Sequence, residues 1–150
     1  MTGQHASNPE DTSPLTLGVL GAGTMGAGIA INAVANGIPT CLFDLNADAQ
    51  ERARSRCEKV LDRWVEKGRK TSDARDAALA RLTLGSLDQA ARQGLVIEAV
   101  FEDLEVKRKL MREIEPDLTA ETVVASNTST LRVVDIASAL SDPSRVIGLH

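Results

Sequence analysis

A glycine-rich hexapeptide near the start of the chain has the composition of a phosphate-binding turn. It follows an apolar run and reads Gly21-Ala22-Gly23-Thr24-Met25-Gly26. In a GxGxxG pattern the first glycine permits a tight turn, the second lets the backbone approach a pyrophosphate, and the third lets helix and strand pack closely. Amide groups at the start of the following helix would then face the phosphates. Because an expected strand precedes the hexapeptide and an expected helix follows it, we predict that these six residues bind a dinucleotide.

A single acidic residue, Asp44, ends the second expected strand. It lies eighteen residues beyond Gly26, where this type of fold brings a carboxylate to the ribose 2′-hydroxyl of adenosine. A carboxylate there favours NAD over NADP, because it would repel a 2′-phosphate. A solvent-exposed aspartate at a strand end is the alternative interpretation, but the glycines upstream favour the cofactor. We therefore predict that the cofactor is NAD.

Acidic residues and a lysine follow the fourth expected strand, in the segment Glu102-Asp103-Leu104-Glu105-Val106-Lys107. Carboxylates at the beginning of a helix interact favourably with its dipole. Asp103 and Lys107 are four residues apart, so their spacing alone indicates an exposed ion pair on one helix face. Spacing alone therefore favours local helix stabilisation over a functional role for this segment, and composition does not decide between the two.

Polar side chains also follow the last two expected strands. Residues 126–130 (SNTST) come after the fifth strand and precede a helix that begins near Leu131. Some of these side chains are expected to cap that helix. The sixth strand ends at residues 148–150 (GLH), so a single histidine lies at its carboxyl end. Residue types alone leave structural and functional roles open for both segments.

Short apolar runs alternate with helical stretches along the chain, which is typical of βαβ units around a parallel sheet. The six expected strands span Leu15–Leu20, Thr40–Phe43, Leu82–Leu84, Leu95–Val100, Val123–Ala125 and Arg145–Gly148. Right-handed crossovers and two mononucleotide halves give the order 3-2-1-4-5-6. The expected fold class is α/β, a Rossmann-type doubly wound parallel sheet. The polar segments all follow the carboxyl ends of strands, where open α/β sheets bind ligands.

A pair of helices is expected between the second and third strands. Apolar residues recur at helical spacing from about Asp48 to Lys67, and Gly68 is expected to cap this helix. A second helical stretch, Ser72–Arg81, leads into the third strand. Because this pair is longer than one crossover helix, we expect it to project beyond the nucleotide-binding fold.

Composition limits the partners of this chain. The net charge is −4 and only 2% of the residues are aromatic, so we expect no nucleic-acid partner. No apolar run is long enough to span a bilayer and the amino terminus lacks the features of a signal peptide, so we expect a cytoplasmic protein without a membrane partner. Cys41 and Cys57 lack metal-ligand spacing, so we expect reduced cysteines and no metal. Residues 1–13, His5 included, are polar and are expected to form a disordered tail before a domain at 14–150.

The chain resembles the L-3-hydroxyacyl-CoA dehydrogenases of fatty-acid β-oxidation, including the 3-hydroxybutyryl-CoA dehydrogenases. The resemblance covers residues 17–150 in family order, through GAGTMGAGIA, the strand end at Asp44, the lysine-bearing helical pair, VIEAVFEDLEVKRKL, SNTSTL and RVIGLH. It implies an enzyme that oxidises L-3-hydroxyacyl-CoA to 3-oxoacyl-CoA. The implied cofactor is NAD, and the implied partner is an acyl-CoA substrate.

The resemblance also implies roles for individual side chains. Glu102 and Lys107 are implied to contact NAD. Ser129 is implied to lie at the cofactor and to hydrogen-bond the substrate oxygen, and we place Asn127 beside it in the substrate site. Neutral His150 is implied to be the catalytic base, which takes the hydroxyl proton as the hydride moves to the nicotinamide.

One lysine of the helical pair, Lys67, is implied to lie near the CoA phosphates. A solvated lysine at a helix end explains this residue equally well. Val60 occupies a position of the same pair where some family members carry a polar contact to CoA. The sequence therefore leaves the CoA site on the helical pair open.

The family pattern continues past His150 into a C-terminal helical domain that is absent from these 150 residues. We expect the full-length enzyme to be a homodimer through that domain, and this chain alone to bind NAD without turnover. Two other functions stay open: a related NAD-dependent hydroxyacid dehydrogenase of the crystallin-like group, and a non-catalytic NAD-binding module. The strings SNTST and GLH favour the acyl-CoA branch.

Overall fold

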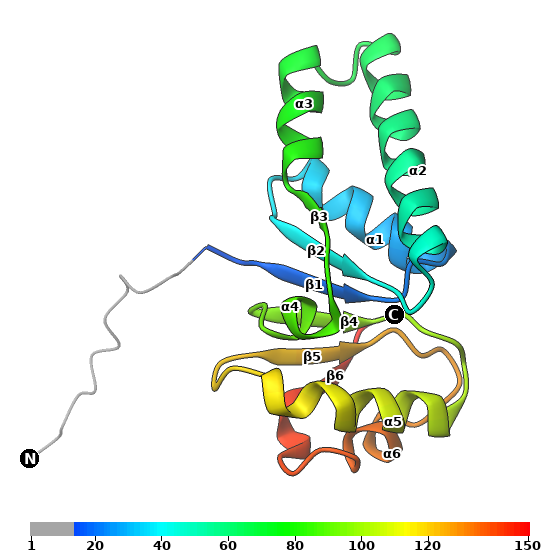
Figure 1. The fold of residues 1–150 in the computed structure, drawn as a ribbon, viewed down its shortest axis with the longest axis vertical. Coiled ribbons are helices and arrows are strands. Elements are labelled where there is room, and N and C mark those ends of the chain that lie inside the picture. Colours follow the sequence, from blue (N-terminus) through cyan, green and yellow to red (C-terminus); the bar gives the residue numbers. More distant parts are fainter. Residues whose placement is uncertain (1–13) are drawn as a thin grey trace, which may run out of the picture.

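A six-stranded parallel sheet forms the centre of the computed structural model, which describes residues 14–150. In chain order the strands are β1 (Leu17–Leu20), β2 (Thr40–Phe43), β3 (Leu82–Leu84), β4 (Leu95–Glu98), β5 (Val123–Ser126) and β6 (Val146–Gly148). Their order across the sheet is β3-β2-β1-β4-β5-β6, which confirms the predicted doubly wound topology. Figure 1 shows the carboxyl end of the chain beside the tips of the strand arrows. The tail predicted at residues 1–13, with His5, lies outside the described residues.

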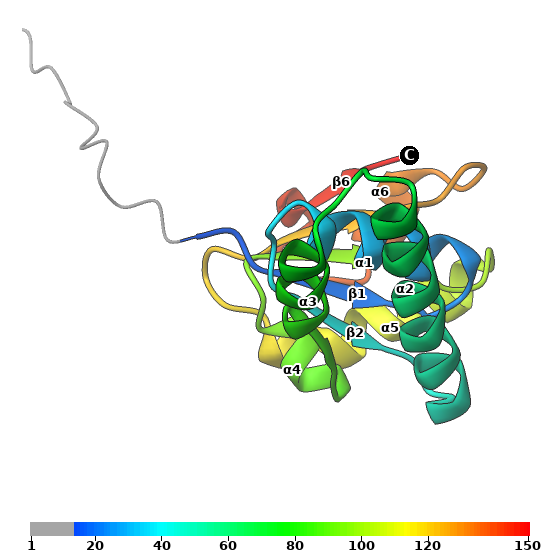
Figure 2. The same cartoon turned by 90° about the horizontal axis from the view of Figure 1, so that it is seen from above.

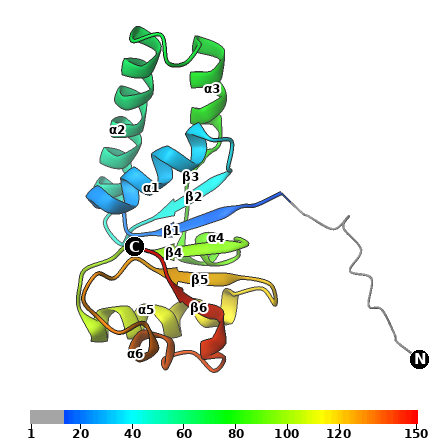
Figure 3. The same cartoon turned by 180° about the vertical axis from the view of Figure 1, so that it is seen from behind.

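Helices cover both faces of this sheet (Figures 1 and 3). The α-helices are α1 (Thr24–Ala35), α2 (Ala47–Glu66), α3 (Ser72–Ala80), α4 (Leu87–Ala91), α5 (Leu104–Ile114) and α6 (Val133–Ala137). Two 3-10 turns, Glu115–Asp117 and Pro143–Arg145, follow α5 and α6. One core packs α1, α2 and α3 on the sheet around Val19, and a second core packs α4, α5 and α6 around Val96. The sheet is therefore buried on both faces, as is usual for a parallel sheet.

The predicted helical pair is α2 and α3, which projects from the sheet in Figure 1. Seen from above, both helices lie over α1 (Figure 2). The Asn46 side chain caps the start of α2, and Gly68, which was expected to cap its end, has a left-handed φ of +69°. Lys70 Nζ donates a hydrogen bond to the carbonyl oxygen of Ala35 at 2.8 Å, which ties the connection to the end of α1. None of the helices in residues 14–150 has both the length and the apolar character needed to cross a membrane.

Some element boundaries differ from the prediction for physical reasons. β4 ends at Glu98 rather than Val100, because the Val100 amide donates to the Glu98 carboxylate at 2.8 Å. β1 begins at Leu17 rather than Leu15, whose side chain is 51% exposed. The helix α4 has five residues, which is too short to give a helical period in the sequence.

Candidate functional site

The three glycines of the hexapeptide occupy positions that have different steric demands. Gly21 has a φ of +106°, and a Cβ there would lie 2.6 Å from the carbonyl oxygen of Ala99. A Cβ on Gly26 would lie 1.7 Å from the carbonyl oxygen of Gly21, so α1 packs directly on the turn. Around the ideal Cβ position of Gly23, no heavy atom of the described residues lies within 4 Å. The Gly23 backbone therefore faces open space, which a pyrophosphate can fill.

The amino terminus of α1 begins at this open backbone. Gly23 is its N-cap residue, and neither a side-chain cap nor an acidic residue occupies its first turn. Side chains do cap other helices: Asn46 caps α2, Thr71 caps α3 and Asp103 caps α5. The free amide groups and the positive dipole end of α1 fit the negative charge of a pyrophosphate.

The carboxylate of Asp44 joins the glycine loop to the end of β2. Its Oδ2 accepts a hydrogen bond from the Ala22 amide at 2.8 Å, and its Oδ1 accepts one from the Asn46 amide at 2.8 Å. Each oxygen has a further lone pair, so the half-buried carboxylate can still accept a ribose hydroxyl. Asp44 therefore orders the glycine loop and remains available to a cofactor.

A cavity of about 770 Å³ opens between the glycine loop, the end of β2 and α5. Its walls are largely apolar and include Val100, Phe101 and Leu45. The side chains of Phe101 and Leu45 are 82% and 92% exposed, which is unusual for large apolar groups. A cavity of this size, with mainly apolar walls and the carboxylates of Asp44 and Glu113 in its lining, fits a nucleoside. The cavity and the glycine loop together fit the adenosine and the pyrophosphate of a dinucleotide.

Glu102 lies between β4 and α5 and contacts the loop that follows β5. Its Oε1 accepts a hydrogen bond from Thr128 Oγ1 at 2.5 Å, and its Oε2 accepts one from the Ser129 amide at 3.3 Å. The Thr128 hydroxyl is the main cause that holds the pKa of Glu102 below its ordinary value, against partial desolvation. The carboxylate is therefore charged at neutral pH and links two loops of the site.

The surroundings of Lys107 differ from the local prediction. Its side chain is 1% exposed, and its Nζ lies 2.6 Å from Glu98 Oε1 and 3.3 Å from the carbonyl oxygen of Val100. The exposed ion pair with Asp103 that helical spacing indicated is therefore wrong. Asp103 instead caps α5 by accepting a hydrogen bond from the Val106 amide at 3.0 Å. A direct contact between Lys107 and NAD stays a prediction, and the buried ammonium group reaches the cavity wall through Val100.

Ser129 and His150 follow the ends of neighbouring strands. Ser126 of β5 pairs with Gly148 of β6, and the Leu149 amide donates to the carbonyl oxygen of Ser126 at 2.9 Å. Ser129 follows this pair by three residues and His150 by two, and both residues are exposed. Both therefore lie at the edge of the sheet that carries the cofactor cavity.

Asn127 lies at the same edge, directly after β5. Its amide donates to the carbonyl oxygen of Glu98 at 2.9 Å and continues the pairing with β4. The half-buried side chain makes no hydrogen bond within residues 14–150. The side-chain carboxamide of Asn127 is therefore available to a ligand at the carboxyl edge of the sheet.

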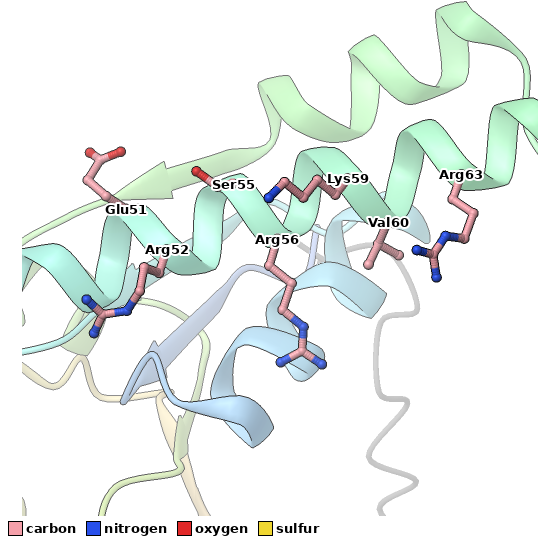
Figure 4. Close-up of a pocket in the computed structure, with 7 residues that line it drawn as sticks. All are labelled: Glu51, Arg52, Ser55, Arg56, Lys59, Val60 and Arg63. Carbon is pink, nitrogen blue, oxygen red and sulfur yellow. The ribbon is translucent and has the colours of Figure 1, made fainter.

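A row of basic side chains extends along α2 (Figure 4). The row consists of Arg52, Arg56, Lys59 and Arg63, which line an open cavity of about 640 Å³. Within the described part of the chain, no carboxylate pairs with any of these four residues. Figure 4 shows Arg56 pointing toward α1, and its Nη1 lies 3.4 Å from the carbonyl oxygen of Thr24 in the hexapeptide. Lys67 is exposed and follows Arg63 by about one helical turn, so its spacing places it at the far end of the row.

Three side chains make contacts in the site that the sequence did not assign. Glu98 is 0% exposed, and its Oε2 accepts a hydrogen bond from Ser126 Oγ at 2.6 Å. The third side chain, Thr128, donates to Glu102 at 2.5 Å. A glutamate inside an apolar strand needs a buried partner, so this signal could have singled out Glu98. It could not have named Ser126, which lies on a different strand.

The fold and the site together define a class of protein. A doubly wound parallel sheet, with a glycine loop and an acidic strand end beside a nucleoside-sized cavity, is a Rossmann-type dinucleotide-binding domain. Residues 16–150 match the model of the family described as "3-hydroxyacyl-CoA dehydrogenase, NAD binding domain". The chain belongs to this family, and its cofactor is NAD.

Individual relatives agree with this family. The chain is 35% identical over 133 residues to "Probable 3-hydroxybutyryl-CoA dehydrogenase" of Bacillus subtilis (strain 168), which covers 88% of this chain and 46% of that protein. The crystal structure of M. tuberculosis FadB2 matches with a TM-score of 0.87 and 38% identity over 92% of this chain and 49% of that chain. The 3-hydroxybutyryl-CoA dehydrogenase from Escherichia coli K12 matches with a TM-score of 0.88 and 36% identity over 92% and 29%. The chain therefore spans about half the length of the first two relatives and less of the third.

Proposed function

We propose that this chain is the NAD-binding part of an enzyme that oxidises L-3-hydroxyacyl-CoA to 3-oxoacyl-CoA. The proposal rests on the placement of Ser129 and His150, which follow neighbouring strands at the edge that carries the cofactor cavity. At that edge, a hydroxyl and an imidazole can act on a substrate oxygen beside the cofactor. The glycine loop and Asp44 hold the adenosine half of the same cofactor.

Oxidation of a secondary alcohol removes a proton from the oxygen and a hydride from the carbon. His150 in its neutral form accepts the proton of the 3-hydroxyl group. The Ser129 hydroxyl donates a hydrogen bond to the same oxygen and fixes its position during the transfer. When bound, NAD supplies the acceptor for the hydride that leaves C3. Glu102 accepts a ribose hydroxyl, and Asn127 contacts the substrate from the loop after β5.

The basic row on α2 supports an acyl-CoA as the substrate. CoA carries a diphosphate and a 3′-phosphate, and a row of cations without paired carboxylates attracts such a ligand. Lys67 extends the row by its spacing, so we place it near the CoA phosphates as well. Because Arg56 contacts the hexapeptide, the row adjoins the cofactor site.

The test of this function is a kinetic comparison in an enzyme that joins this domain to the remaining part found in its relatives. Ser129→Ala and His150→Gln should each lower kcat at least about a hundredfold, because general-base catalysis contributes about 10² to 10⁴. Thr130→Ala is the control, since Thr130 is exposed on the same loop and makes no side-chain hydrogen bond within residues 14–150. Near-normal turnover in Ser129→Ala or His150→Gln would remove that residue from the mechanism.

A further inference from the structure

We infer that Glu98 is a positioning residue, which fixes the loops after β4 and β5 relative to each other for cofactor binding. The inference rests on the NAD-binding function and extends it to a side chain that is closed to solvent. Glu98 ends β4 and is 0% exposed. It therefore acts on the cofactor through the groups that it holds.

Both oxygens of the Glu98 carboxylate accept hydrogen bonds. Oε1 accepts from Lys107 Nζ at 2.6 Å and from the Val100 amide at 2.8 Å. Oε2 accepts from Ser126 Oγ at 2.6 Å. Lys107 and Ser126 are 1% and 0% exposed. The carboxylate therefore joins α5, the loop after β4 and the end of β5 at one buried point.

The first arm of this network holds the loop after β4 at Val100. The Val100 amide donates to Glu98, and its carbonyl oxygen accepts a hydrogen bond from Lys107 Nζ at 3.3 Å. Val100 and Phe101 line the cofactor cavity. Glu102 follows them directly, so the position of its carboxylate depends on the same backbone. The Glu98–Lys107 pair thus sets one wall of the cavity.

The second arm reaches the loop after β5 through Ser126. Ser126 lies opposite Glu98 in the parallel register, and its Oγ also accepts a hydrogen bond from the Thr128 amide at 3.4 Å. Thr128 Oγ1 in turn donates to Glu102 at 2.5 Å. A buried contact between Ser126 and Glu98 therefore joins the ends of β5 and β4, and a contact between Thr128 and Glu102 nearer the surface joins the loops that follow them. Ser129 follows Thr128 directly and takes its position from this arrangement.

Stability alone does not explain a buried ion pair at this place. The desolvation of two charges is costly, and apolar side chains that replace a buried pair often leave a protein equally stable. An ion pair with further hydrogen bonds instead fixes the orientation of the groups that it joins, which apolar contacts leave free. Here the hydrogen bonds to the Val100 amide and carbonyl oxygen orient the backbone that lines the cofactor cavity. This placement argues for a role in binding.

The test compares two ligands of different length, NAD and AMP, by calorimetric titration of the chain. AMP occupies the adenosine half beside Asp44, whereas NAD extends to the loop after β5. Ser126→Ala removes one hydroxyl and should raise the Kd for NAD about tenfold, while the Kd for AMP stays within about twofold. Glu98→Gln also releases Val100 and Lys107, so it should raise the Kd of both ligands about tenfold or more.

Ile114→Val is the matched control, because Ile114 is buried on α5 and does not line the cavity. It should lower Tm about as much as Ser126→Ala and leave both Kd values within about twofold. If Ser126→Ala lowers Tm but leaves the Kd for NAD within about twofold, the network serves stability alone and the inference is overturned. If Glu98→Gln does not fold, Ser126→Ala by itself still distinguishes a positioning role of the network from a purely stabilising one. No NAD binding by the unaltered chain would overturn the cofactor-dependent function as well, whereas equal NAD affinity in Ser126→Ala overturns the positioning role only.

Discussion

Carboxylates at the carboxyl edge of the sheet hold the loops of the site in place. Asp44 accepts hydrogen bonds from the amides of Ala22 and Asn46, and Glu102 accepts one from the Thr128 hydroxyl. Loops that are ordered in this way cost less entropy when a ligand binds. The same carboxylates therefore hold the loops in place and can accept hydrogen bonds from a bound ligand.

The pKa of Glu102 tests the contact between the two loops. In Thr128→Val the hydroxyl that stabilises the charged form is lost, so the pKa of Glu102 should rise toward its ordinary value. A carboxyl whose pKa is lowered by folding contributes stability above its ordinary pKa and loses this contribution as the pH falls through the lowered value. As the pH falls from the ordinary pKa of a glutamate through the lowered pKa of Glu102, the unaltered chain should lose part of its free energy of unfolding, and Thr128→Val should lose less of it.

Carboxyl-carbon NMR titration measures this pKa directly. Thr130→Val is the control, because the exposed Thr130 makes no contact with Glu102 among the described residues. It should leave the titration of Glu102 unchanged. The same pKa in Thr128→Val as in the unaltered chain would refute the role of the hydroxyl.

Spacing along the chain predicts the role of a residue when that role depends on its sequence neighbours. It does not predict contacts between residues on different elements of the fold. The demands on Gly21 and Gly26 arise within a strand, a turn and a helix, so the hexapeptide predicted the loop that is observed. Lys107 was assigned to Asp103 because helical spacing shows only neighbours on the same helix. Its partner, Glu98, lies on the preceding strand, β4. The spacing of charged residues along a helix does not show that the Lys107 side chain is buried.

At the scale of elements, the packing of α1 on the glycine turn gives a stability test. Gly26→Ala should lower the free energy of unfolding by about 1–3 kcal/mol, because its Cβ would meet the Gly21 carbonyl oxygen and displace α1. Gly28→Ala, on the same helix, has open space and should raise that free energy by about 0.5–1 kcal/mol. Urea unfolding measures both changes. Equal stability of the two variants would contradict the close approach of helix and turn.

The basic row on α2 gives a second test at this scale, by titration with CoA. Arg63→Ala removes a cation of the row and should raise the Kd for CoA about threefold to tenfold. Arg54→Ala is the matched control, since Arg54 lies on the same helix but pairs with Glu58 at 3.7 Å and does not line the cavity. It should change the Kd less than about twofold. A loss of equal size in both variants would show that the helix charge, and not the row, attracts CoA.

Element type and order follow from hydrophobic pattern, whereas some boundaries depend on side chains. The strands were predicted because apolar runs in a parallel sheet are buried on both faces. The end of β4 was not predicted, since it depends on the hydrogen bond between Val100 and the Glu98 carboxylate. The basic row was also missed, because Lys67, directly after α2, was the only cation of this region that was singled out. A count of cations at helical spacing over Arg52–Arg63 could have identified it.

Across the whole molecule, the cofactor cavity and the basic row adjoin at the start of α1. The cofactor cavity extends from the glycine loop to α5, and the basic row extends along α2 from Arg56 outward. The residues that fit the adenosine half of NAD all lie within 14–150, so this chain should bind NAD without a further segment. The doubly wound order was predictable because right-handed crossovers leave few alternatives.

Calorimetric titration of the chain with NAD and with NADP, under the same conditions, tests the NAD-binding function directly. NAD should bind at least about tenfold more tightly, which is about 1.4 kcal/mol, because the Asp44 carboxylate repels a 2′-phosphate. Asp44→Ala should narrow this difference. NADP that binds as tightly as NAD, or a chain that binds neither cofactor, would contradict the function proposed for this fold.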